Sequence, residues 1–438
     1  MNTKTLQHFS VALCVSLAAL LAGCAKHNHA PNLTSITLDP IAEQYVKLGL
    51  ELGQYDKDYV DAYLGPDQWK THAKHNLRSK QQLAADIKLL FESLKNFEVN
   101  GKQQKLRHKA LYRNVRAMDV RARMVNGETF SFAEEARLIY DVDIPSYDYR
   151  TFDQALAEID KLVPGKGDLA QRVATFRKQF EVANDKVSEV VDQAISECSK
   201  RSSQYISLPA NERFELQYVT DKNWSGYNWY QGDNKSLMQI NQDFPMQIDR
   251  AITLGCHEGY PGHHVWNVLI ENNLLNKNGW IEYSIFPLFS PYALIAEGSA
   301  NFGVELSFPD KQKIVYESDV LFPLAGLDPA KTEALDKLTK LTGQLSHSRN
   351  AITQQYLNGE MSRKQAIEMT RKYSLVSKER AEQSVRFSEQ YRAYVLNYNL
   401  GKEIVRNYVN KQSKNEAQKW QAFERLLTEL STASDMTE

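Results

Sequence analysis

Three histidines and one glutamate lie close together in the segment His257-Glu258-Gly259-Tyr260-Pro261-Gly262-His263-His264. Zinc-peptidase helices place two histidines four positions apart, so that both imidazoles face one metal ion. Here the fourth position after His257 is Pro261, and the next histidine is His263, which an unbroken α-helix would turn well away from His257. The segment can therefore form a metal site only where the helix is interrupted.

Pro261-Gly262 supplies such an interruption. Proline removes a backbone donor and kinks a helix, and glycine tolerates the distorted backbone that results. A bulge at this dipeptide would bring His263 to the place of an ordinary second ligand. We therefore expect His257 and His263 to bind the metal ion, with His264 as the alternative ligand or as a group that supports the ligands.

A catalytic zinc needs a third protein ligand and a position left for water. Glu297 follows an apolar stretch that begins at Ile285, where a carboxylate is costly unless it binds a cation or a strong donor. Its alternative role is a glutamate at a helix N-terminus or one paired with an arginine. We predict that Glu297 is the third ligand and that Glu258 is the general base.

The C-terminal part offers donors for the oxyanion that forms during hydrolysis of a peptide bond. We predict Tyr398 for this role, with Arg392 and Tyr394 in substrate binding. The alternative is that these side chains brace a C-terminal helix. A predicted strand at 236–241, which ends at Asn241, lies just before the histidine segment and could pair with an extended peptide as an edge strand.

The N-terminus carries the pattern of a lipoprotein signal peptide in residues 1–23. Lys4 precedes a short apolar run at 11–22, which is too short to span a bilayer as a helix. The run ends at Leu21-Ala22-Gly23-Cys24, which resembles the bacterial lipobox, so Cys24 is expected to carry lipid. Because Ala25 is not aspartate, we expect the anchor to lie in the outer membrane, facing the periplasm.

Two further cysteines, Cys198 and Cys256, are far apart in the sequence, and we expect them to be buried thiols rather than a disulfide. The formal net charge of −1 and the lack of a basic block exclude nucleic acid as an expected partner.

Hydrophobic periodicity predicts a mostly α fold, with a small mixed sheet next to a zinc-peptidase-like helix pair. A polar tether at 24–39 should precede a single helical domain at 40–438, with a catalytic segment at 214–310 and a helical C-terminal part at 328–438. A long helix at about 166–205, broken near Asn184, and strands at 214–219 and 236–241 are expected. Capping boxes predict helices that begin at Ser79, Ser131, Thr151 and Ser362.

The histidine segment, the Glu297-Gly298 dipeptide and the closing Asn397-Tyr398-Asn399-Leu400-Gly401 resemble the bacterial domain-of-unknown-function 885 family. Its members look like lipoproteins and are similar to gluzincin metallopeptidases. The likeness extends from about Tyr45 to Tyr408. It implies a helical fold and zinc-dependent hydrolysis, with peptides of the cell envelope as substrates and Zn²⁺ as the cofactor. The alternatives are a metal- or peptide-binding lipoprotein without turnover, and a zinc amidase or esterase that uses the same site.

Overall fold

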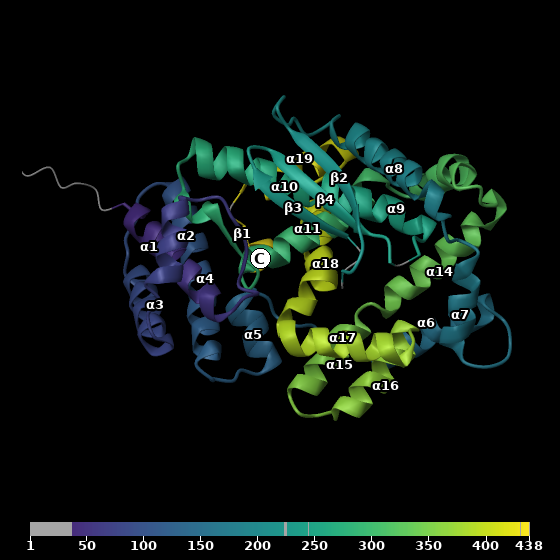
Figure 1. Ribbon diagram of the computed structural model, residues 1–438, viewed down its shortest axis with the longest axis horizontal. Coiled ribbons are helices and arrows are strands. Elements are labelled where there is room, and N and C mark those ends of the chain that lie inside the picture. The colour runs from purple at the N-terminus through teal and green to yellow at the C-terminus, as the bar shows by residue number, and fades with distance from the viewer. Residues whose placement is uncertain (1–36, 223–225, 244, 430, 438) are drawn as a thin grey trace, which may run out of the picture. The chain divides into compact units, whose positions relative to one another are not determined.

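A computed structural model describes residues 37–222, 226–243, 245–429 and 431–437 (Figure 1). The described chain is mostly helical, with two small sheets, which confirms the predicted fold class. The predicted signal peptide and the lipidation site at Cys24 lie outside the described residues. Among the helices that the structure describes, none has the length and apolar character that crossing a bilayer requires.

The first helices form a group around α4 (Lys102–Val125), whose buried residues include Ala110, Val115 and Met118. The flanking helices are α1 (Asp39–Tyr55), α2 (Asp67–His75), α3 (Lys80–Lys95) and α5 (Phe132–Ile139). The predicted caps at Ser79 and Ser131 are confirmed, because each side chain accepts a hydrogen bond from a backbone N–H of the first turn.

A second apolar cluster joins α6 (Tyr149–Leu162) to helices of the C-terminal part, through Phe152, Leu338 and Ile352. These helices are α14 (Thr332–Leu345), α15 (Ser348–Leu357), α16 (Arg363–Ser374) and α17 (Lys378–Tyr391). Further helices are α7 (Leu169–Lys178), α8 (Val187–Ser202), α12 (Gln312–Tyr316), α13 (Phe322–Leu324) and α19 (Glu416–Thr428).

Two helix predictions were wrong in detail. Asp148, not Thr151, caps α6, since its side chain accepts from the Arg150 amide. The long helix expected at 166–205 is instead α7 and α8, with a single 3₁₀ turn at Asn184–Lys186 between them. The predicted break near Asn184 is therefore present, but it divides the segment into two helices rather than interrupting one long helix.

The larger sheet has the order β2-β4-β3, with strands Arg213–Val219, Lys235–Asn241 and Gly226–Gly232 (Figure 1). Strand β4 is parallel to β2 and antiparallel to β3, so it is the central strand. The prediction that 236–241 is an edge strand open to a peptide was wrong. It failed because the Gly- and aromatic-rich segment before it folds as β3, through a tight turn at Asp233 and Asn234, both of which have positive φ. A separate two-stranded sheet pairs β1 (Val60–Tyr63) with β5 (Ile285–Pro287).

Cys198 and Cys256 form a disulfide, so the prediction of two free thiols was wrong. Their separation in sequence is 58, but α8 packs along the segment that contains Cys256 and brings the two Cα atoms to 5.3 Å. Sequence distance carried no information on this packing. A disulfide agrees with the oxidising envelope that the signal-peptide pattern predicts.

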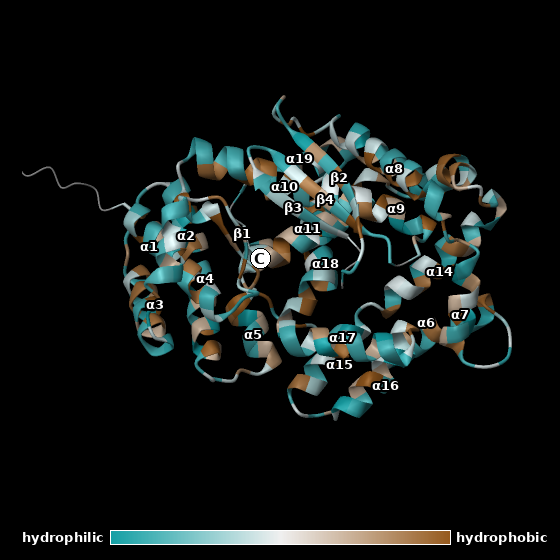
Figure 2. Cartoon of the chain, viewed as in Figure 1, coloured by the Kyte–Doolittle hydropathy of each residue, from teal (hydrophilic) through white to brown (hydrophobic). Residues whose placement is uncertain are grey.

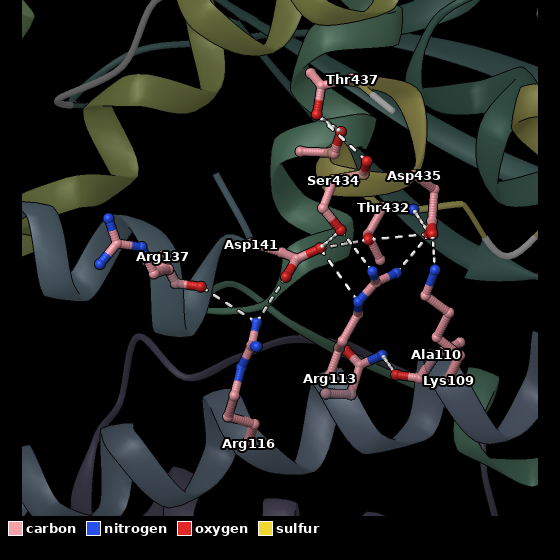
Figure 3. A network of polar contacts seen from close by, with 12 residues as sticks. Lys109, Ala110, Arg113, Arg116, Arg137, Asp141, Thr432, Ser434, Asp435 and Thr437 are labelled. Carbon is pink, nitrogen blue, oxygen red and sulfur yellow. Dashed lines mark hydrogen bonds and ion pairs between the residues drawn. The ribbon is translucent and has the colours of Figure 1, made fainter. Parts of the chain in front are cut away.

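The last described helix, α20 (Ala433–Thr437), is tied to the N-terminal helices by a polar network (Figure 3). The hydroxyls of Thr432 and Ser434 each donate to Asp141, at 2.6 Å. Arg113 of α4 makes ion pairs with both Asp141 and Asp435. Arg113 therefore joins two carboxylates that come from opposite ends of the domain's sequence.

Candidate metal centre

The histidine segment begins in α9 (Ile248–Leu254) and continues through a π-helical turn at Gly255–Gly259. The Tyr260-Pro261 peptide is cis, and a new helix, α10 (His263–Ile270), then starts at His263. The predicted interruption is present. It is a widened helical turn after which the helix ends and a new helix begins, rather than a bulge within one helix. A Cβ atom at Gly262 would lie 1.8 Å from the His257 carbonyl oxygen, so this turn requires glycine.

His257, His263 and Glu297 lie together, with one potential ligand atom from each within 4.8 Å of the others. Nε2 of His257 is 3.6 Å and Nε2 of His263 is 3.9 Å from Oε2 of Glu297. The two imidazole rings are nearly perpendicular, with centroids 4.7 Å apart. Tetrahedral ligands held about 2.1 Å from zinc are about 3.4 Å from one another. The separations from Glu297 are thus close to those of a zinc site.

The chemistry of the donors also fits a cation. Oε2 of Glu297 is buried and has no hydrogen-bond partner among the described residues. Such an atom is costly unless a ligand satisfies it. The side chains of His257, His263 and Glu297 are 15%, 20% and 12% exposed. The group is therefore sheltered yet reachable from solvent, as a catalytic metal ion requires.

Burial sets the protonation of this group when no metal ion is bound. It lowers the pKa of His263 to about 4, and it lowers the pKa of His257 well below its usual value, with the neighbouring His263 adding to the effect. Burial also raises the pKa of Glu297 to about 7. Burial and the nearby Glu297 raise the pKa of Glu258 to about 8. The imidazoles are therefore neutral near pH 7, which is the form that binds a metal ion.

Two side chains orient the ligands. The Tyr394 hydroxyl donates to Oε1 of Glu297 at 3.0 Å, which leaves Oε2 as the free oxygen. The Asn301 side chain hydrogen-bonds His257 and also donates to the backbone oxygen of Glu297 at 2.9 Å. Partners of this kind fix the rotamer of a metal ligand and tune its basicity.

A close helix contact brings the tyrosines to the ligands. Glu297 lies on α11 (Pro291–Ser307), which is apolar along most of its length and packs against α18 (Leu396–Lys411) (Figures 1 and 2). A Cβ atom at Gly298 would lie 2.5 Å from the backbone of Gly401, so neither position accepts a larger residue without movement. The two glycines allow the segments at 297–298 and 397–401 to lie in contact. This contact sets the distance between Glu297 and the tyrosines.

Glu258 lies beside the ligands, with Oε1 3.9 Å from Nε2 of His257. Its backbone oxygen accepts a 2.6 Å hydrogen bond from the Asn228 side chain, which projects from β3. The sheet thus holds the π-helical turn in place, and the Glu258 carboxyl group remains available for chemistry.

His264 does not join the cluster. Its Nδ1 lies 2.8 Å from the Ser236 hydroxyl and its Nε2 lies 2.6 Å from Glu212, and the side chain is fully buried. Both ring nitrogens are therefore engaged, and the alternative assignment of His264 as a ligand is not supported by the geometry. These contacts agree with the other predicted role of His264, which is to support the segment that carries the candidate ligands.

The predicted substrate-binding residues have other contacts. Arg392 pairs with Glu135 at 2.5 Å. The Asn241 side chain donates to the Lys222 backbone oxygen and accepts from the Asp243 amide. It therefore holds the backbone that follows β4. The Tyr394 hydroxyl is directed at Glu297. A substrate role for these three residues stays a prediction.

Tyr398 packs edge-on against Tyr394, with ring centroids 5.7 Å apart, and burial together with Glu297 raises its pKa. The hydroxyl is therefore a neutral donor near the ligands. Sequence reasoning missed Asp61, which accepts a hydrogen bond from Tyr227 and whose charge raises the pKa of Glu297. Asn301 was also missed, although its place one helical turn after Glu297 was a usable signal.

Fold and cluster together define a mostly helical protein with two histidines and one glutamate placed so that they could hold a metal ion. No family profile and no curated protein matches the chain. A solved structure described as a candidate lipoprotein from Colwellia psychrerythraea is similar, with 14% identity, 90% of this chain and 77% of the other covered, and a TM-score of 0.50. Another, a candidate lipoprotein of unknown function from Shewanella oneidensis, has 12% identity, 91% and 80% coverage, and a TM-score of 0.44. At this identity, the Colwellia structure bears on the fold alone.

Proposed function

We propose that this protein is a zinc-dependent peptidase that hydrolyses small peptides in the cell envelope. The observation that carries the proposal is the buried, unpartnered Oε2 of Glu297, which faces the Nε2 atoms of His257 and His263. Two neutral imidazoles and one carboxylate are the ligand set of many catalytic zinc sites. Zinc held by these three side chains would acidify a water molecule and polarise the carbonyl group of the substrate.

The chain's own residues then supply the proton transfers. Glu258 accepts the proton of the attacking water and returns it to the leaving amine, so the C–N bond breaks as the carboxylate and the amine form. Tyr398 donates a hydrogen bond to the carbonyl oxygen as negative charge develops on it. Tyr394 and Asn301 keep the ligands in position while this happens.

We also propose that lipid on Cys24 anchors the protein in the envelope, at the periplasmic face of the outer membrane. The supporting observations are the Leu21-Ala22-Gly23-Cys24 pattern and the description of the Colwellia protein as a candidate lipoprotein. The Cys198–Cys256 disulfide is consistent with a compartment outside the cytoplasm.

The test is a joint measurement of metal content and hydrolysis on the mature chain from Cys24, purified in detergent. We expect one zinc ion per chain and cleavage of members of a mixed peptide library, detected by mass spectrometry. Zinc without cleavage of any peptide would favour a binding lipoprotein. Cleavage of esters or non-peptide amides alone would favour the amidase or esterase alternative. No bound metal after reconstitution would reject the proposal.

A further inference from the structure

Arg349 is a half-buried cation, and no carboxylate among the described residues forms an ion pair with it. It is the second residue of α15, and its guanidinium carbon lies 4.6 Å from the centre of the Phe387 ring. Its Nε is buried and makes no hydrogen bond, and no ion pair joins Arg349 to any carboxylate in the described chain. Burial lowers the pKa of this side chain.

The two arginines that are more deeply buried than Arg349 are both paired with carboxylates. Arg107 binds Glu282 and Asp39, and Arg113 binds Asp141 and Asp435. A guanidinium removed from water without a carboxylate is unfavourable, and its stem could be replaced by an apolar side chain at less cost. Arg349 is therefore an exception that a structural role in the core does not explain.

The position of Arg349 relates it to the metal centre. The Phe387 ring, which Arg349 contacts, packs on Tyr391 with ring centroids 4.4 Å apart. Tyr391 in turn packs on Tyr394 at 5.9 Å, and the Tyr394 hydroxyl donates to Glu297. Helix α15 also packs against the turn at Arg392–Val395, which carries Tyr394.

The carboxylates around the centre make Arg349 more distinctive. Oε1 of Glu258 and Oε2 of Glu297 lie 3.9 Å and 3.6 Å from the same atom, Nε2 of His257. In the metal-free centre an anionic group of a substrate is repelled by these two carboxylates, and at Arg349 it meets a positive charge that no described carboxylate pairs with. The planar guanidinium matches a carboxylate, with two parallel N–H groups directed at its two oxygens.

We propose that Arg349 binds the free C-terminal carboxylate of a peptide substrate, so that the protein is an exopeptidase that acts on C-terminal residues or on dipeptides. This inference rests on the proposed peptidase function and specifies its substrate class. Tyr398, which packs against Tyr394, faces the carbonyl oxygen of the bond that is cut. Water adds to that carbonyl, the C–N bond breaks, and the terminal amino acid leaves with the proton delivered by Glu258.

Matched peptides test the substrate class. The mature, zinc-loaded chain is assayed with a peptide bearing a free C-terminal carboxylate and with the same peptide as its C-terminal amide. We expect kcat/KM for the acid to exceed that for the amide by about 100-fold, the effect of a buried charge-assisted pair. Arg349→Gln should lose about 100-fold on the acid and little on the amide, and Arg349→Lys should restore part of the loss. Arg386→Gln, at an exposed position beside Phe387, is the control and should behave as the unsubstituted chain.

Binding without turnover is measured by calorimetry on the metal-free protein, with N-benzoylglycine and its methyl ester as probes. We expect the acid to bind, the ester to bind more weakly, and Arg349→Gln to abolish the difference. Equal cleavage of acid and amide, or a difference in probe binding that survives Arg349→Gln, would show that Arg349 does not bind the substrate carboxylate, while leaving the peptidase proposal standing. Arg349-dependent binding of the acid with no cleavage of any peptide would support carboxylate binding by Arg349 and reject the peptidase function. Zinc content and thermal unfolding of each variant establish that it is folded.

Discussion

Oε2 of Glu297 lies 3.6 Å from Nε2 of His257, while Oε1 of the same carboxylate accepts a hydrogen bond from Tyr394. One oxygen is thus fixed by the protein and the other is left for a ligand. Because Tyr394 precedes α18 and Glu297 lies on α11, the contact between these helices determines how the carboxylate is presented. The metal centre depends on this packing as well as on its three ligands.

Removing the Tyr394 hydroxyl tests this dependence. Tyr394→Phe deletes the hydrogen bond to Oε1 and lets the Glu297 carboxylate rotate, so we expect zinc affinity to fall about 10- to 100-fold. Competition with a zinc chelator measures the change. Tyr391→Phe is the matched control, because its hydroxyl makes only a 3.5 Å contact with Asp58. Equal affinity in both variants would show that Tyr394 does not orient the ligand.

Glu258→Gln separates binding from chemistry. The amide keeps the size of the side chain but cannot accept the proton of the attacking water. We expect zinc content to remain at one ion per chain and kcat to fall by about 100- to 10,000-fold. Metal analysis and steady-state kinetics on the same sample give both values. Retained turnover would remove Glu258 from the role of general base.

The adjacent histidines should respond differently to substitution. His263→Ala removes a ligand and should abolish zinc binding while changing stability little. His264→Ala should keep zinc but destabilise the fold by about 1–3 kcal/mol, because Ser236 and Glu212 lose a buried partner. Metal analysis and denaturant unfolding of both variants check this. Loss of zinc in His264→Ala, with the fold intact, would reverse the assignment of the two residues.

Some of the fold and site was predictable because it depends on local physics. The helix caps at Ser79 and Ser131, and the need for an interruption between His257 and His263, follow from hydrogen-bonding groups and helical rotation over a few residues. The form of the interruption was not predictable, since a cis peptide and a π-helical turn depend on the packing of neighbouring elements.

Most of the features that were missed depend on long-range contacts. The disulfide requires α8 to pack against the histidine segment, and the central position of β4 requires the aromatic segment before it to pair as β3. Asp61, which accepts a hydrogen bond from Tyr227 of β3, lies far from the histidine segment in sequence, and the sequence assigned it no role in the site. A single sequence has no local pattern that places such residues together.

The Cys198–Cys256 disulfide should stabilise both the domain and the metal centre. It ties α8 to the residue that precedes His257. The chain-entropy relation gives a stabilisation of about 4 kcal/mol for a loop of this length. We expect the double variant Cys198→Ser/Cys256→Ser to unfold at lower denaturant concentration and to bind zinc more weakly. Unchanged unfolding of the variant, or of the protein after reduction, would contradict this.

Acid should loosen the C-terminal network around Arg113. Hydrogen bonds from Ser434 and Thr432 and the charges of Arg113 and Arg116 lower the pKa of Asp141, and bonds from Arg113 and Lys109 lower that of Asp435, in each case against an opposing effect of burial. A carboxyl group whose pKa is lower in the folded state stabilises the fold above its unfolded pKa, near 4, and loses this contribution as pH falls through the folded value.

Asp435→Asn therefore should lower Tm at pH 7, and its difference from the unsubstituted chain should shrink toward pH 3. Asp143→Asn is the control, because that side chain is 79% exposed in its pair with Arg137, where an ion pair contributes little at any pH. Thermal unfolding of the three proteins between pH 7 and pH 3 provides the measurement. A Tm difference for Asp435→Asn that stays constant over this range would mean that the network is held by its geometry rather than by the Asp435 charge.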